Sequence, residues 1–221
     1  MSKSRAVQCL VFDWDGTLAD STATIVACMQ AAIEQNGLPV RSGQAIRDII
    51  GLGLVEAVDC LYPDTPGINH DQVADSYRQH YRARYRGKTA LFPPVKQVLG
   101  ELYARDYLLA IATGKSRRGL DSSLQETGTR HLFHMSRCAD ETFSKPHPQM
   151  LHDILSVLDV APENTLMIGD SSYDMQMAKA AGCLPVAVSY GSQERQRLLE
   201  YDPVACLEKL DDLIPWLEAN T

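Results

Sequence analysis

The sequence lacks any apolar stretch close to the roughly 20 residues that a membrane-spanning helix needs. Its first apolar run, Ala6–Phe12, is short and leads directly into charged residues, so we expect no secretory signal and a cytoplasmic protein. An excess of positive charge is absent too, because the formal net charge is -7 and the pI is about 5.3. This balance argues against nucleic-acid binding through bulk charge, so an anionic ligand must meet a local positive site.

Paired cysteines and repeats are also missing. The six cysteines are scattered singly with no CxxC motif, so we expect reduced, buried thiols rather than a disulfide framework. The histidine pairs His131/His134 and His147/His152 lack convincing partners for a zinc site. Without internal repeats, the 221 residues can form one large domain, or one domain that carries an insert.

Apolar runs typical of strands buried on both faces alternate with helical segments. Four runs are strong and the last one given is weak: Ala6–Phe12, Tyr107–Ala112, Asn164–Ile168, Leu184–Val188 and Met135–Cys138. The predicted helices between them are Val95–Ala104, Arg117–Glu126, Pro148–Leu158 and Asp174–Ala181. This alternation predicts an α/β fold with a doubly wound parallel sheet that helices cover on both faces.

Residues 20–88 break the alternation, because they contain helical segments and no strand-like run. We predict helices at Thr22–Gln35, Ala45–Leu61 (interrupted by glycines) and Gln72–Arg86. The sequence therefore predicts an all-helical cap at 20–88, inserted after the first strand into a core formed by 1–19 and 89–221.

Polar residues follow the predicted strands at the points where ligands bind in open parallel sheets, near the carboxyl ends. Four segments carry them: Asp13–Thr17, Thr113–Ser116, Ser144–Pro146 and Gly169–Asp174. Two of their carboxylates, Asp13 and Asp170, should face each other and repel, and a divalent cation such as Mg²⁺ resolves that conflict with oxygen ligands. Asp174 lies about one helical turn after Asp170, so it should reach the same ion.

The same edge of the sheet offers groups that bind phosphate. Thr113 supplies a hydroxyl, Gly114 and Lys115 supply backbone N–H groups at a helix start, and Lys145 supplies a positive charge. A carboxylate such as Asp13 can attack phosphorus to form an aspartyl-phosphate. Asp15, two residues further on, could protonate the leaving oxygen and then activate water.

These motifs resemble those of haloacid dehalogenase (HAD) superfamily phosphatases. The segment DWDGTLADS resembles their first motif, and ATGKS, SKPHPQM and MIGDSSYD resemble the second, third and fourth in the expected order. The resemblance covers nearly the whole chain and is greatest to the phosphoglycolate-phosphatase-like branch, which has a Rossmann-like core and a helical cap. It implies a magnesium-dependent hydrolase of a small phosphorylated molecule.

The resemblance also implies a role for each residue. Asp13 would be the nucleophile and a metal ligand, and Asp15 the acid and base, with its backbone carbonyl on the metal. Asp170 would bind Mg²⁺, and Asp174 would support it directly or through water. Thr113 and Lys145 would hold phosphate. The second carboxylate, Asp15, favours a phosphatase over a dehalogenase.

Two other activities fit the same motifs. A sugar-phosphate mutase would return the phosphoryl group from Asp13 to a sugar, and a non-enzymatic protein of this fold would only bind a ligand. The intact set of motif residues argues against the second. In the cap, a stripe of tyrosines at 77, 81 and 85 beside arginines at 78, 82 and 86 fits either a packed helix or a basic surface that faces substrate. Gly51–Leu54 fits either a loop that reaches the site or a flexible break.

Overall fold

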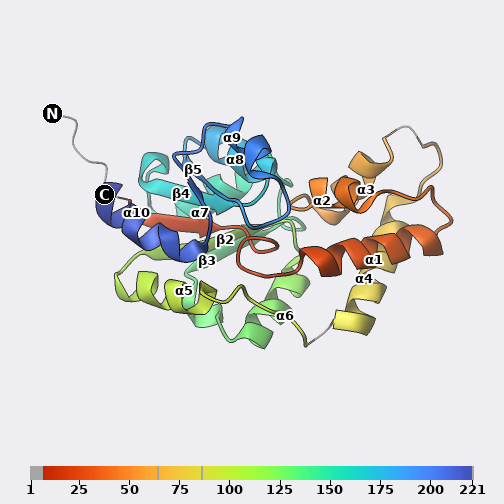
Figure 1. Cartoon of the computed structure of the whole chain (residues 1–221), viewed down its shortest axis with the longest axis horizontal. Helices are drawn as coiled ribbons and strands as arrows, with labels where there is room; N and C mark the ends of the chain where they lie inside the picture. The colour runs from red at the N-terminus through yellow and green to blue at the C-terminus, as the bar shows by residue number, and fades with distance from the viewer. Residues whose placement is uncertain (1–6, 64, 86, 221) are drawn as a thin grey trace.

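The computed structural model describes residues 7–63, 65–85 and 87–220, and the side chain of Tyr85 is not among the described parts. Its core is a six-stranded sheet in the order β3-β2-β1-β4-β5-β6, in which all neighbouring strands run parallel (Figure 1). The strands are β1 (Cys9–Phe12), β2 (Leu108–Thr113), β3 (Met135–Cys138), β4 (Thr165–Gly169), β5 (Leu184–Val188) and β6 (Ala205–Leu207). The chain builds outward from β1 in one direction and then, from β4 on, in the other. The predicted doubly wound parallel sheet is therefore confirmed.

Helices cover both faces of the sheet, because successive strand residues point to opposite sides. Leu10 and Phe12 of β1 pack in one apolar cluster, and Cys9 and Val11 pack in another. The first cluster includes residues of α5 (Val95–Ala104), α6 (Arg117–Thr127) and α10 (Leu213–Asn220), and the second includes residues of α7 (Gln149–Leu158) and α8 (Ser172–Ala180). A short helix, α9 (Arg195–Leu199), packs with α8 and β5.

Among the described residues between β1 and α5, four helices form their own apolar cluster beside one end of the sheet (Figure 1). They are α1 (Thr22–Gln35), α2 (Gly43–Asp48), α3 (Leu54–Leu61) and α4 (His70–Tyr85), and α1 packs against α4 and α2. The boundaries of the cap domain at 20 and 88 stay a prediction. Within the described ranges, no helix is both long enough and apolar enough to cross a bilayer.

Some elements differ from those that the sequence predicts. The helical segment predicted at Ala45–Leu61, interrupted by glycines, is two separate helices, because Gly51 between α2 and α3 has a φ of 106°, which a helix does not accommodate. The last strand, β6, has only three residues, too few for a periodicity to be recognised. Ala6 and Arg86, the outer residues of two predicted elements, lie outside the described residues.

Candidate active site

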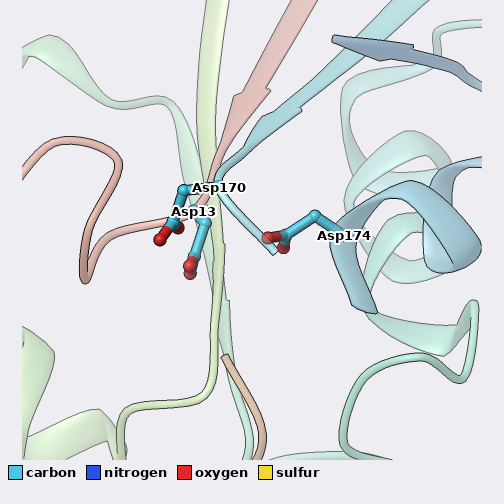
Figure 2. A group of neighbouring side chains, drawn as sticks. All are labelled: Asp13, Asp170 and Asp174. Carbon is cyan, nitrogen blue, oxygen red and sulfur yellow. The ribbon is translucent and has the colours of Figure 1, made fainter. Parts of the chain in front are cut away.

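Three carboxylates meet at the carboxyl edge of the two central strands. Asp13 follows β1, Asp170 follows β4 and Asp174 lies in the first turn of α8, from which it points toward the other two (Figure 2). Each side chain offers an oxygen that lies within 4.8 Å of an oxygen of the other two. All three residues are at most 1% exposed. The structure thus brings together the carboxylates that the sequence predicts to meet.

Asp13 is the least satisfied of the three carboxylates. Its Oδ1 lies 2.8 Å from Nζ of Lys145, and its Oδ2 accepts no hydrogen bond from any described residue. Burial raises the pKa of Asp13 well above the ordinary value, and Asp174 and Asp170 raise it further, while Lys145 opposes them. A buried carboxylate with free lone pairs beside two others is a site for a positive ligand.

Lys145 is a fully buried cation in contact with two carboxylates. Its ammonium lies 2.8 Å from Asp13 Oδ1 and donates a hydrogen bond of 2.6 Å to Asp174 Oδ1. Burial alone would lower the pKa of this lysine, but Asp13 and Asp174 together raise it above the ordinary value. The group that the sequence predicts to hold phosphate therefore also holds the carboxylate cluster together.

Neighbouring hydroxyl and backbone groups orient Asp170. Its Oδ1 accepts a hydrogen bond from Thr17 Oγ1 at 2.9 Å, and its Oδ2 accepts one from the backbone N–H of Ser192 at 2.6 Å. Burial, with a contribution from Asp174, raises the pKa of Asp170 to about 6 although these two donors oppose the shift. Thr17 lies within the first motif, whereas no local pattern in the sequence marks Ser192.

Asp174 is fixed by the start of its own helix. Ser171 is the N-cap of α8, and its backbone N–H and its Oγ donate to Asp174 Oδ2 at 3.1 and 2.6 Å. The other oxygen, Oδ1, accepts from Lys145. Asp174, which the sequence predicts to share a site with Asp170, is thus also the N3 residue of a capping box with Ser171.

The donor set fits a hard divalent cation such as Mg²⁺. Asp13, Asp170 and Asp174 offer only oxygen atoms, and Asp13 has lone pairs that no described residue uses. Gly16 has a φ of 81° and lies so close to Asp170 that a methyl group there would collide with its carboxylate. The loop after β1 can therefore lie this close to the carboxylate cluster because residue 16 has no side chain.

Asp15 points its carboxylate to a separate set of partners. Its Oδ2 lies 3.0 Å from Lys115 Nζ, and its Oδ1 accepts a 2.7 Å hydrogen bond from Ser21 Oγ. The Lys115 ammonium also lies 5.2 Å from the ring centre of Tyr81 in α4. The sequence does not predict these side-chain contacts, because they depend on how two core segments pack against each other and against the predicted cap.

Thr113 and Gly114 lie at the end of β2 beside this group. Thr113 is fully buried, and its hydroxyl accepts a hydrogen bond from the backbone N–H of Lys115 at 3.2 Å. Gly114 faces the backbone carbonyl of Leu52, so a methyl group at position 114 would collide with it. Ser116 then caps α6 by accepting from Gly119 at 3.3 Å. The second motif is therefore both a helix start and a contact with the cap.

The glycine-rich loop between α2 and α3 reaches the site. Its Gly53 N–H donates to Ser144 Oγ at 2.7 Å, and the preceding Asp48 carbonyl accepts from Gln193 at 3.2 Å. A cavity of about 370 Å³ lies between this loop and the core, with Asp13 and Asp15 among its lining residues. Of the two interpretations of this segment, the structure shows the loop that reaches the site.

Comparisons with known proteins agree with the fold and identify the family. Residues 10–188 match the family model described as haloacid dehalogenase-like hydrolase. Phosphoglycolate phosphatase of Salmonella paratyphi A is 29% identical, with 98% of this chain and 95% of that protein covered, and the Vibrio cholerae enzyme of that name is 27% identical over 90% and 92%. A haloacid dehalogenase-like hydrolase from Streptococcus pneumoniae has a similar structure, with a TM-score of 0.83, 26% identity and coverage of 95% and 98%. The chain belongs to the haloacid dehalogenase-like hydrolase family.

Proposed function

We propose that the protein is a Mg²⁺-dependent phosphatase that hydrolyses a small phosphomonoester through an aspartyl-phosphate on Asp13. The observation that carries this proposal is the buried Asp13 carboxylate, whose Oδ2 has no hydrogen-bond partner among the described residues and which lies beside Asp170, Asp174 and Lys145. Phosphatases among the relatives support the reaction class, because relatives such as those from Salmonella paratyphi A and Vibrio cholerae carry the name phosphoglycolate phosphatase.

Asp13 is the proposed nucleophile. One of its carboxylate oxygens forms a bond to phosphorus while the bond from phosphorus to the ester oxygen breaks, and the alcohol leaves. Lys145 beside it would neutralise charge on the transferring group, and Thr113 and Gly114 would offer a hydroxyl and a backbone N–H to the phosphate oxygens.

Asp15 is the proposed general acid and base. It gives a proton to the leaving alcohol in the first step and takes a proton from water in the second, when water attacks phosphorus and frees Asp13. Lys115 and Ser21 hold its carboxylate at 3.0 and 2.7 Å, which supports a fixed position for proton transfer. Asp15 would also offer its backbone carbonyl to the metal.

Asp13, Asp170 and Asp174 would hold Mg²⁺, the last directly or through water. The bound ion would supply positive charge that stabilises the transferring phosphoryl group. We propose a small phosphorylated metabolite as substrate and a cytoplasmic location, with neither nucleic acid nor membrane as partner. Phosphoglycolate is the first substrate to assay, because relatives carry its name.

The test is release of inorganic phosphate from a set of phosphomonoesters by purified protein, with Mg²⁺ and with chelator. We expect turnover that requires the metal. We expect Asp13→Asn to lower the turnover rate by about 10⁴-fold or more. Unaltered activity in Asp13→Asn would remove that residue from the nucleophile role. Isomerised sugar phosphate in place of free phosphate would identify a mutase, and absence of any turnover would favour a protein that only binds.

A further inference from the structure

The site opens into a cavity that is large for a two-carbon substrate. Its volume is about 370 Å³, and it extends from Asp13 and Asp15 to residues of α1, α3 and α4. Cavities of this size, within the range of roughly 300–1,000 Å³, hold ligands as large as drugs. The alcohol part of a substrate that fills this space must therefore be larger than that of phosphoglycolate.

One wall of the cavity is aliphatic. Ile25 and Met29 of α1, and Ile50 of the glycine-rich loop, line it, and all three are at most 8% exposed. Next to them the loop contributes Leu52 and no charged side chain. An apolar group that covers this wall removes apolar surface from water, which favours binding in proportion to the area covered.

A second wall is aromatic. Tyr77 and Tyr81 lie one turn apart on α4, with ring centres 6.1 Å apart and ring planes inclined by 31°, and both line the cavity. Among the described residues, the Tyr77 hydroxyl has no hydrogen-bond partner. Such rings offer a flat apolar face with one polar edge, which suits a ring in the ligand.

The positive charges of the cavity are poorly placed for a carboxylate next to the phosphate. Among the described lining residues, Lys115 is the one cation that is nearly buried, and it already pairs with Asp15. Arg78 pairs with Asp75 at 2.7 Å, and Arg82 and Arg118 are exposed.

The backbone donors of the loop are also engaged. The N–H of Leu52 donates to the Ile49 carbonyl, and the N–H of Gly53 donates to Ser144 Oγ. A short acid would therefore lack a free buried partner.

We propose that the leaving alcohol of the substrate is uncharged, larger than two carbons and ring-bearing, and that it lies between the α1 aliphatic wall and the α4 tyrosines. This inference rests on the proposed phosphatase activity and gives that activity a substrate class. The two tyrosine rings and Met29 would then be specificity-determining contacts.

The experiment compares kcat/KM for phosphoglycolate, ethyl phosphate and 2-phenylethyl phosphate with Mg²⁺. All three leaving groups are alkyl alcohols, so the comparison avoids the advantage of a reactive aryl ester. We expect 2-phenylethyl phosphate to exceed both others by at least about tenfold, because its ring can cover the apolar walls. A higher kcat/KM for phosphoglycolate would overturn the inference while leaving the phosphatase proposal standing.

Variants on the two walls locate the effect. Tyr77→Ala and Met29→Ala should lower the ratio of kcat/KM for 2-phenylethyl phosphate to that for ethyl phosphate by about fivefold or more, whereas Tyr77→Phe keeps the ring and the ratio. Gln79→Ala, at an exposed position of the same helix, is the matched control. An unchanged ratio in the folded Tyr77→Ala and Met29→Ala proteins would also overturn the inference. Failure of every ester to turn over would instead reject the phosphatase proposal.

Discussion

The ammonium of Lys145 and the carboxylate of Asp174 form a fully buried ion pair, with a distance of 2.6 Å between Nζ and Oδ1. The same ammonium reaches Asp13 at 2.8 Å, so one lysine joins the proposed nucleophile to a residue of α8. Because two carboxylates lie around one buried cation, the site carries an excess of negative charge until a cation binds. We therefore expect the stability of the fold, metal binding and activity all to depend on this excess of negative charge.

Replacement of Lys145 by methionine should destabilise the fold. In chelator it would leave Asp13 and Asp174 buried without their cation, and we expect the free energy of unfolding to fall by about 3–5 kcal/mol. Urea denaturation measures this, and Mg²⁺ should restore part of the loss. The control is Lys179→Met, because its partner Asp202 is exposed and that pair should contribute less than about 1 kcal/mol. Equal stability of Lys145→Met and wild type in chelator would contradict the prediction.

Asp15→Asn should slow both chemical steps by about 10²–10⁴-fold for alkyl phosphates, because it can neither give nor take the proton. With p-nitrophenyl phosphate the first step should suffer less, since its leaving group needs no proton, and phosphoenzyme should accumulate. Acid quench with radiolabelled substrate measures the trapped phosphate. Ser21→Ala, which removes one donor to Asp15, should cause a smaller loss of the same kind. A wild-type rate without trapped phosphate would count against the role of Asp15.

The stability of metal-free protein should depend on the ionisation of Asp170. Its pKa is raised from 3.8 to about 6 in the folded state, so the folded protein favours the protonated form. The stabilisation from this group is fully present below about pH 4 and is lost as the pH rises through about 6. Asp170→Asn avoids the loss, because its oxygen can accept from Ser192 while its NH₂ donates to Thr17.

We therefore expect Asp170→Asn in chelator to be more stable than wild type at about pH 8, by on the order of 2–3 kcal/mol, and equally stable near pH 4. Chemical denaturation at the two pH values measures the difference. With Mg²⁺ the order should reverse, because the variant lacks a metal ligand and wild type gains binding energy. The same stability difference at both pH values would show that Asp170 does not titrate in this range.

Gly114→Ala should disturb the contact between the core and the glycine-rich loop. The added methyl would collide with the Leu52 carbonyl, so the loop must move, and we expect kcat/KM to fall by about tenfold or more. The matched control is Gly100→Ala in α5, where the added methyl meets open space and helix propensity should raise stability slightly. Steady-state kinetics and thermal unfolding of both variants check this. Full activity of Gly114→Ala would mean that the loop adjusts without cost.

Much of this protein could be read from local patterns. Continuous apolar runs such as Leu184–Val188 identify buried strands, and alternation with helices determines a parallel sheet, whose carboxyl ends necessarily share one edge. For that reason the meeting of Asp13, Asp170 and Asp174 was predictable from their positions after β1 and β4. The glycines that interrupt Ala45–Leu61 were visible as well, although the break into α2 and α3 required the positive φ of Gly51.

Other features were decided only when distant segments packed. The pairing of Lys115 with Asp15, the Ser192 donor to Asp170 and the tyrosine wall of the cavity join residues far apart in the chain. Sequence spacing reports which face of one element a side chain occupies, because helix and strand periods are local. Which opposite element that face meets depends on the docking of the helices between β1 and α5 onto the core, and this docking shapes the cavity.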